Sequence, residues 1–405
     1  MDTNNSTIER AAFAGVQEPA PFSLRERDQR YRAIRQQLAE RGVDAVVVTG
    51  TNLLYLSNGL PGEMFGLLPT REDEVFTGVL TWRFLADIPT SIILEAQNWV
   101  TDIRSGRDAS PLVARLKELK LESGTLGLAG SVSHKAYALI AAALPSLKIV
   151  DVSDILDNVR TIKSEEELAT LDWANRIFDA AVERVRAVCR PGMLGRHIVQ
   201  EGRKAMWDAG GDLEATFQFN FGARSAQNPL LAELCLDRRI APGDIGAMTA
   251  HCHYRHYGGH TDQVIVFGQP SALHVAMFDA VKHVRAAVMK RVKAGAAQRD
   301  LFDAYDAACA ETGFATSPHA QMHLYGIDIP EFPGPAFRIK DNKGGAGLGG
   351  GGNFILKPGM VYSISPTLVN EKTGDALLGG GSFAVTETGH RVLGPARPVE
   401  MVVAG

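Results

Sequence analysis

The chain has 405 residues, of which 45% are hydrophobic and 22% are charged, a balance typical of soluble globular proteins rather than disordered or fibrous ones. Its formal net charge is only −4 at pH 7, with 42 lysines and arginines against 46 aspartates and glutamates. Because no basic cluster offsets this balance, we expect no nucleic-acid partner. The length exceeds what one hydrophobic core usually serves, so it predicts two domains.

The cysteines and the start of the chain bear on the cellular compartment. Four cysteines stand far apart, without a Cys-x-x-Cys pair: Cys189, Cys235, Cys252 and Cys309. This spacing argues against a disulfide framework or a structural zinc site and favours a reducing compartment. The polar start lacks the order of a signal peptide, and no apolar run is long enough to span a bilayer. We therefore expect a cytoplasmic protein without a membrane partner.

The first part of the chain predicts an arm and then an α/β domain. Residues 1–23 are polar and rich in alanine and read as an arm. Apolar residues recur at helical spacing over 24–41, and a short buried strand follows at 45–48, with a turn at 49–52. Further strands are expected at 79–81, 90–94, 125–128 and 148–152, and helices at 111–119 and 133–143. This alternation is typical of an α/β domain, here residues 24–157.

The remaining residues, 158–405, predict an α+β domain with long helices against an antiparallel sheet. A capping box, Ser164–Glu167, begins a long amphipathic helix. Two more helices are expected at 272–292 and 299–311, and strands at 216–221, 245–249, 263–267, 360–365 and 382–386. The glycine-rich stretch 344–352 has no strand before it and no helix after it, so it indicates a mobile loop or lid rather than a phosphate cradle.

Four motifs stand in an order and spacing that resemble one protein family: Thr51–Gly59, Arg160–Leu168, Lys357–Tyr362 and Val385–Gly389. They are similar to motifs of the creatinase/prolidase/aminopeptidase P family, and the likeness covers about residues 24–400. The resemblance implies a pita-bread catalytic domain behind a smaller creatinase-like N-terminal domain. It also implies a homodimer that acts on a small-molecule substrate.

The resemblance further implies a two-metal site of two Asp, one His and two Glu, and this chain lacks most of that set. The first Asp falls at or beside His251, the second on Asp262, and the His on His323. The two Glu fall on Ser365 and near Gly380. Because a bridging carboxylate is needed to hold two cations together, we expect the paired-metal mechanism to be lost. The expected site contains no metal and no other cofactor.

The metal-free creatinase pattern fits no better. Its essential His would lie at Gln227, and its two glutamates correspond to about Val264 and Gly380. Pro330 stands where the peptidases have a second, substrate-facing His. The resemblance thus implies a known scaffold with a changed active site.

A histidine-rich segment, residues 251–262, supplies an alternative chemistry. Alternate residues of a strand share a face, so His260 and Asp262 should point into the pocket together, and His251 and His253 should also share a face. Gly258-Gly259 predicts a turn or bulge between the two pairs. Imidazole titrates near neutrality and can act as base and then acid. The predicted catalytic residues are His323, Asp262, His260, His251 and His253.

The residues expected to bind substrate are Gln227, Asn228, Arg224, Tyr325, Ser365 and Glu331. With His323 moving the proton and Asp262 fixing its tautomer, we expect a metal-independent enzyme that hydrolyses a C–N bond or performs a lyase-type cleavage. Two alternatives stay open. Imidazoles and Asp262 could form a mononuclear zinc, iron or nickel site of a prolidase-like hydrolase, or the chain could be a catalytically inactive pita-bread binding module.

Overall fold

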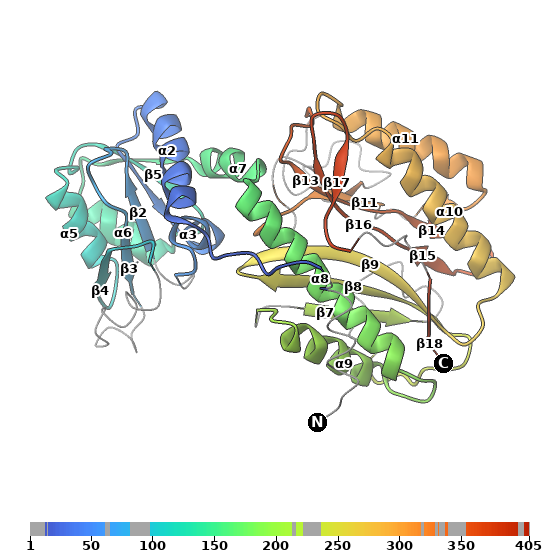
Figure 1. Ribbon diagram of the computed structural model, residues 1–405. Coiled ribbons are helices and arrows are strands. Elements are labelled where there is room, and N and C mark those ends of the chain that lie inside the picture. The colour runs from blue at the N-terminus through green and yellow to red at the C-terminus, as the bar shows by residue number, and fades with distance from the viewer. Residues whose placement is uncertain are drawn as a thin grey trace. The chain divides into compact units, whose positions relative to one another are not determined.

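The computed structural model describes residues 13, 15–60, 65–81, 98–212, 216–221, 236–316, 320–328, 331, 337–338, 354–395 and 401–404. The chain divides into two compact units (Figure 1). The smaller unit is Ala20–Arg160, and the larger unit combines Met1–Pro19 with Thr161–Gly405. The expected strand at 90–94 and the glycine-rich stretch 344–352 lie outside the described residues.

The smaller unit is a mixed six-stranded sheet with helices, as the α/β prediction required. Its strand order is β4-β3-β2-β1-β5-β6. The central strand β1 pairs antiparallel with β2 and parallel with β5. The strands are β1 (Ala45–Val48), β2 (Phe65–Pro69), β3 (Thr77–Leu80), β4 (Asp102–Ser105), β5 (Thr125–Ala129) and β6 (Lys148–Asp151). The helices are α2 (Leu24–Glu40), α3 (Gly50–Ser57), α5 (Ser110–Glu118), α6 (His134–Ala143) and α7 (Ser153–Thr161).

Residues 49–52 do not form the expected turn. Thr49 is extended and is followed at once by α3, whose Leu53 and Leu56 are completely buried. The helix is only 8 residues long, too short for its apolar spacing to stand out in the sequence. Burial of these two leucines stabilises it in the folded chain.

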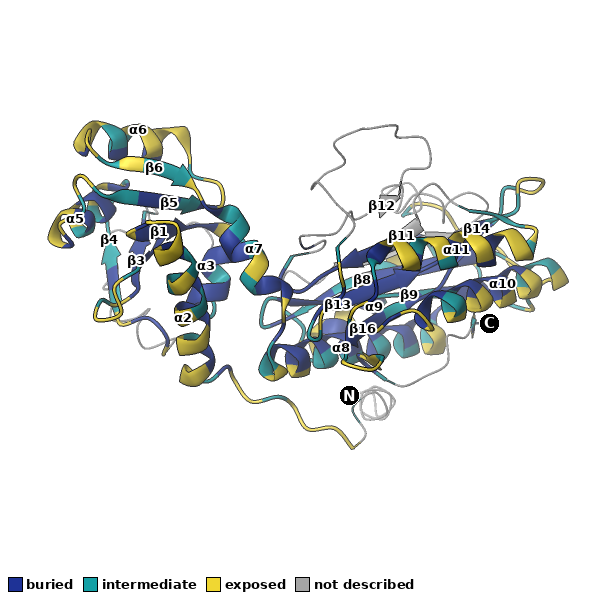
Figure 2. Cartoon of the chain, turned by 90° about the horizontal axis from the view of Figure 1, so that it is seen from above, coloured by how far each residue is buried: buried dark blue, intermediate teal, exposed yellow. Residues whose placement is uncertain are grey.

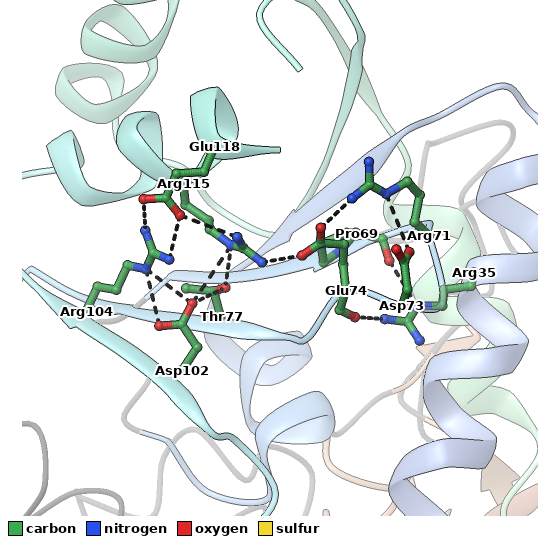
Figure 3. A network of polar contacts seen from close by, with 10 residues as sticks. All are labelled: Arg35, Pro69, Arg71, Asp73, Glu74, Thr77, Asp102, Arg104, Arg115 and Glu118. Atoms are coloured by element: carbon green, nitrogen blue, oxygen red, sulfur yellow. Dashed lines mark hydrogen bonds and ion pairs between the residues drawn. The ribbon is translucent and has the colours of Figure 1, made fainter. Parts of the chain in front are cut away.

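A network of arginines and carboxylates joins β3, β4 and α5 in the smaller unit (Figure 3). Arg104 donates to both carboxylate oxygens of Glu118, at 2.7 and 2.8 Å, and to Asp102 at 3.2 Å. Arg115 donates to Glu74 at 2.7 Å. Exposed ion pairs of this kind contribute about 0–1 kcal/mol each, so we assign the network a structural role.

The larger unit contains three sheets, with strand orders β18-β9-β8-β7, β12-β11-β13-β16-β17 and β10-β14-β15. The strands are β7 (Thr216–Phe221), β8 (Ile245–Tyr254), β9 (Tyr257–Phe267), β10 (Ala315–Thr316), β11 (Ala320–Leu324), β12 (Phe337–Arg338), β13 (Val361–Ser365), β14 (Thr367–Val369), β15 (Ala376–Leu378), β16 (Gly381–Val385), β17 (His390–Val392) and β18 (Val402–Ala404). The helices are α8 (Glu165–Val188), α9 (Gly195–Asp208), α10 (Ala272–Met289) and α11 (Gln298–Thr312).

Strand β9 separates two apolar layers of the larger unit. Ile265 and Phe267 pack with α8 and α9, whereas Val264 and Val266 pack with α10, α11 and strands β11, β13 and β16. The sheets are therefore buried, while the outer faces of α10 and α11 are exposed (Figure 2). Gly259 allows α8 to approach β9 closely, because a Cβ there would lie 2.6 Å from the carbonyl carbon of Ala174.

Helix α8 begins at the predicted capping box. Ser164 Oγ accepts a hydrogen bond from the Glu167 backbone N–H at 3.2 Å, and the Ser164 N–H donates to Glu167 Oε2 at 2.8 Å. Both halves of the capping box are thus formed, and three acidic side chains in the first turn complement the helix dipole. Within the part of the chain that the structure describes, no helix is both long and apolar enough to cross a membrane.

The turn between β8 and β9 is not at Gly258-Gly259, so that prediction is wrong. The chain reverses at Arg255 and His256, whose φ angles of 50° and 69° are left-handed, and the two glycines lie inside β9 opposite His253 and Cys252. Two successive residues with positive φ form a turn that matches the twist of a hairpin. The uninterrupted hairpin therefore fixes which side chains of β8 and β9 share a face.

Candidate active site

Four polar side chains from the β8–β9 hairpin lie on one face because directly paired residues of antiparallel strands point the same way. Thr249 is paired with Asp262, and His251 with His260. The second sheet contributes His323 from β11, which is paired with β13. We call His251, His260, His323 and Asp262 the imidazole cluster.

The rings of the imidazole cluster lie in a row, with His260 between His251 and His323 and with Asp262 beside His260. The ring centroid of His260 lies 4.9 Å from that of His251 and 5.1 Å from that of His323. Asp262 Oδ2 is 3.9 Å from His260 Nε2, and Asp262 Oδ1 accepts a hydrogen bond of 2.6 Å from Thr249. His260, His323 and Asp262 are 2%, 3% and 0% exposed, so the chemistry of the cluster takes place away from bulk water.

Burial favours the neutral form of His251 and His323. It lowers the pKa of His251 to about 3, helped by the neighbouring His260 and His323 and opposed by Asp262. It also lowers the pKa of His323, opposed by the Leu324 carbonyl and Asp262. His323 Nδ1 is 3.1 Å from that carbonyl, which can only accept, so a neutral His323 ring is protonated on Nδ1 and Nε2 carries the lone pair. Neutral rings of this kind are bases and metal ligands.

Asp262 is the buried acid of the cluster. Burial raises the pKa of its carboxyl, while the nearby Ser365 hydroxyl and the hydrogen bond from Thr249 lower it in part. A carboxyl that is costly to ionise in isolation is stabilised as a carboxylate by an adjacent cation. A cation bound in the cluster would therefore stabilise the ionised form of Asp262.

The two positions where the family resemblance implies glutamates are packed against each other. Ser365 is completely buried. A Cβ built on Gly380 would lie 2.1 Å from the Ile364 carbonyl oxygen and 2.3 Å from Ser365 Oγ. Such distances exclude any side chain at Gly380 without a shift of the backbone. The second half of a two-metal site is therefore closed in this chain.

Two of the predicted substrate-binding residues beside the cluster are engaged in the protein interior. The ring of Tyr325 is 6.3 Å from that of His260, and its hydroxyl accepts a hydrogen bond of 3.3 Å from Asn175. Glu331 forms a buried ion pair with Lys163 and accepts a hydrogen bond of 3.1 Å from the Ile327 N–H. This pairing closes the loop after β11 and keeps the Glu331 carboxylate out of the imidazole cluster.

The remaining residues singled out from the sequence either lie away from the cluster or fall outside the described part of the chain. His253 is half-buried and lies opposite Gly258, nearer the hairpin turn than the cluster. The rest lie outside the described residues: Arg224, Gln227, Asn228 and Pro330.

The predictions from sequence missed Thr249 and Lys163. Thr249 lies two residues before His251 on the same strand, so the two-residue period that placed the other members would also have placed it. Lys163 lies inside the Arg160–Leu168 motif, but its spacing gave no sign of its distant partner. Thr249 thus holds Asp262 in position, and Lys163 holds Glu331.

The donor atoms of the imidazole cluster suit a metal ion by their chemical type. Three neutral imidazoles and one carboxylate are the donor types that zinc, iron and nickel accept. Among the residues that the structure describes, no three His, Cys, Asp or Glu side chains already stand in a ligating arrangement. The donor chemistry therefore fits a single ion, and the side chains would have to reorient around it.

Two family models match the chain. The model described as metallopeptidase family M24 matches residues 169–390, more than half of the chain, and the model of the creatinase/prolidase N-terminal domain matches residues 30–162. The Xaa-Pro dipeptidase of Pyrococcus horikoshii is 20% identical over 377 residues, which cover 90% of this chain and 97% of the relative. The ectoine hydrolase of Halomonas elongata is 22% identical over 409 residues, which cover 93% and 97%.

The solved structures agree on the architecture. The Xaa-Pro dipeptidase from Bacillus anthracis matches with a TM-score of 0.76 at 19% identity, covering 93% of this chain and 99% of that one. At this identity the likeness shows the fold alone. The prediction of a two-domain, creatinase-like chain with a pita-bread C-terminal domain is confirmed.

The prediction of a metal-independent enzyme is wrong. The family model that covers the imidazole cluster describes metallopeptidases, and the Pyrococcus relative is named as a dipeptidase. These findings agree better with the alternative of a prolidase-like hydrolase with a single metal ion. They support an enzyme of the hydrolase type, because these relatives are named as a dipeptidase and a hydrolase.

Proposed function

This chain belongs to metallopeptidase family M24, and on that premise we propose that it is a hydrolase that cleaves the amide bond of a small substrate with one metal ion. The observation that carries the proposal is the gathering of three imidazole rings, the middle one, His260, lying 3.9 Å from the buried carboxyl group of Asp262. The closed positions at Ser365 and Gly380 support one ion rather than two.

His251, His260, His323 and Asp262 would hold the ion. When bound, it supplies a Lewis acid that polarises the scissile carbonyl and lowers the pKa of water. The protein supplies the positioning. Thr249 fixes one oxygen of Asp262 by a hydrogen bond. The Leu324 carbonyl accepts from His323 Nδ1 and so orients the ring, which leaves the lone pair of Nε2 to bind the ion.

Metal content and peptidase activity test the proposal together. We expect the purified full-length chain to contain about one equivalent of a transition metal and to hydrolyse members of a panel of Xaa-Pro dipeptides and other small amides. Chelation should abolish the activity and metal addition should restore it. His323→Ala should lower the rate by about a hundredfold or more.

His283→Ala is the matched control, because His283 is an exposed residue of α10 that contacts Glu311 at 2.8 Å, away from the cluster. It should leave metal content and rate unchanged. Activity that survives complete chelation would refute the single-metal scheme. A wild-type chain that binds no ion and cleaves nothing in the panel would favour the inactive binding module, which the loss of both glutamate positions also supports.

The family resemblance also supports a homodimer in the cytoplasm as part of the proposal. Light scattering of the full-length chain should give twice the mass of one chain. A monomer at all concentrations would contradict the dimer without affecting the proposed chemistry.

A further inference from the structure

A second polar cavity lies on the opposite face of β9 from the imidazole cluster. It encloses about 60 Å³ and is lined by β9, α8, α10 and the start of β16. Neighbouring residues of a strand face opposite sides, so Thr261 and Gln263 line this cavity while His260 and Asp262 belong to the cluster. The cavity is therefore separate from the proposed active site.

Arg285 brings a positive charge into the wall of the cavity. Its Nε is buried and makes no hydrogen bond, and within the described residues it forms no ion pair. Burial lowers the pKa of its guanidinium, and the Arg285 charge contributes to the lowered pKa of His390, after burial itself. Arg285 is half-buried, and an anion in contact with its guanidinium would compensate the charge and accept the hydrogen of the buried Nε.

The cavity also presents acceptors that need a hydrogen. Asn175 Nδ2 donates to the Leu171 carbonyl at 2.8 Å and to Tyr325, so the amide orientation is fixed and Oδ1 is left buried without a hydrogen bond. Gln263 Oε1 is likewise buried without one. A ligand that satisfies both sides of the cavity must accept from Arg285 and donate to an amide oxygen.

None of the other polar groups in the wall is an available hydrogen-bond donor. Thr261 donates its hydroxyl hydrogen to the Gly380 carbonyl at 3.0 Å, and Ser382 donates to the His260 carbonyl. Asp179, a carboxylate in the same wall, has an interaction of its own, and its Oδ2 is a further buried acceptor that only a protonated ligand oxygen could approach favourably. None of these groups supplies the missing donor to Asn175.

We propose that this cavity is a binding site for a small, singly protonated oxyanion of the hydrogencarbonate type. Its charged oxygens accept from Arg285, and its O–H donates to Asn175 or Gln263. The volume has room for about four atoms of the size of a water oxygen, which matches the four heavy atoms of such an anion. Chloride and formate carry the charge but no donor, so they fit the cavity less well.

The test uses the thermal stability of the full-length chain in hydrogencarbonate, compared with chloride and formate at equal pH and ionic strength. We expect hydrogencarbonate alone to raise Tm by about 3 °C at saturation. Arg285→Met should abolish this rise because it removes the charge. Lys282→Met is the matched control, since Lys282 lies on the same helix, pairs with Asp279 at 2.6 Å and does not line the cavity.

Gly381→Ala tests the site without removing a polar group. A Cβ at Gly381 would lie 3.8 Å from Arg285 Nη2 and 3.5 Å from Thr261 Oγ1, ordinary contacts that the fold tolerates while the methyl group fills the cavity. This variant should also lose the response, and it decides the matter if Arg285→Met fails to fold. An equal Tm rise in Gly381→Ala, no rise in the wild type, or a crystal structure grown in hydrogencarbonate with only water in the cavity would overturn the proposal.

Discussion

The histidines of the imidazole cluster owe their chemistry to burial more than to their own type. An exposed imidazole titrates near pH 6.5, whereas burial and two neighbouring rings bring the pKa of His251 to about 3. Thr249 and the Leu324 carbonyl then fix the orientation of Asp262 and His323. The result is a set of neutral donors around one acid.

The stability of the protein should depend on pH through His251. Between pH 6.5 and about 3 the unfolded chain takes up a proton at His251 and the folded chain does not. This contribution to stability is complete above pH 6.5 and is lost as the pH falls toward 3. Asp262, whose pKa burial raises from 3.8, acts with the opposite sign.

A substitution separates the two effects. We expect His251→Gln to flatten the fall in Tm as the pH is lowered from about 7 to about 4.5, because glutamine does not titrate. Tm measured across this range in both proteins gives the comparison, with the exposed His283→Gln as control. Parallel curves for the wild type and His251→Gln would contradict the assignment.

At the scale of elements, a buried ion pair joins the start of α8 to the segment after β11. Lys163 and Glu331 have side chains only 1% and 4% exposed. A backbone hydrogen bond extends the link, since the Lys163 N–H donates to the Gly359 carbonyl at 2.9 Å. The pair thus holds together three segments that are far apart in the sequence.

Breaking one partner of this pair should destabilise the protein strongly. Lys163→Met leaves the Glu331 carboxylate buried without its cation, and we expect a loss of about 3–5 kcal/mol in the free energy of unfolding. Urea denaturation measures it. The double variant Lys163→Met/Glu331→Gln should lose less than the sum of the two single variants. Additive losses would show that the two side chains do not interact.

Helices and strands whose signals are local could be predicted from the sequence, and features that depend on distant contacts could not. Helix α8 could be predicted because its capping box and apolar period act locally, within a few residues. The β8–β9 turn could not, because Arg255 and His256 adopt left-handed backbone while the nearby glycines serve the approach of α8. Contacts between distant segments, such as Lys163 with Glu331, leave no periodic trace in the sequence.

The same distinction holds for the site. The two-residue period of β9 correctly placed His260 and Asp262 on one face, and the structure adds His251 opposite His260. Sequence reasoning could not tell that Gly380 and Ser365 are packed against each other. The preference for a metal-dependent scheme came from the comparison with metallopeptidases.

At the scale of the whole molecule, the start of the chain belongs to the larger unit although the smaller unit follows it in sequence. The ring of Phe13 packs against that of Trp173 of α8 with 4.4 Å between ring centroids and a tilt of 41°. Glu18 accepts a hydrogen bond of 2.6 Å from Tyr254, next to the hairpin turn. The predicted arm is thus partly docked on its own chain.

Removing the aromatic contact should weaken this docking. We expect Phe13→Ala to lower the free energy of unfolding by about 1 kcal/mol and to change the fluorescence of Trp173. Val16→Ala is the control, because Val16 is 37% exposed in the same segment. An unchanged stability and spectrum in Phe13→Ala would show that the arm is not held in solution.

The pairing of β8 with β9 has a consequence for how this protein can change over evolution. One residue inserted or deleted at the start of β9 would exchange the faces of the rest of that strand, sending Thr261 and Gln263 toward His323 and turning Asp262 toward α8. Point substitutions leave both faces in place. Descendants of this chain can therefore exchange ligands one at a time, but they must keep the length of the hairpin.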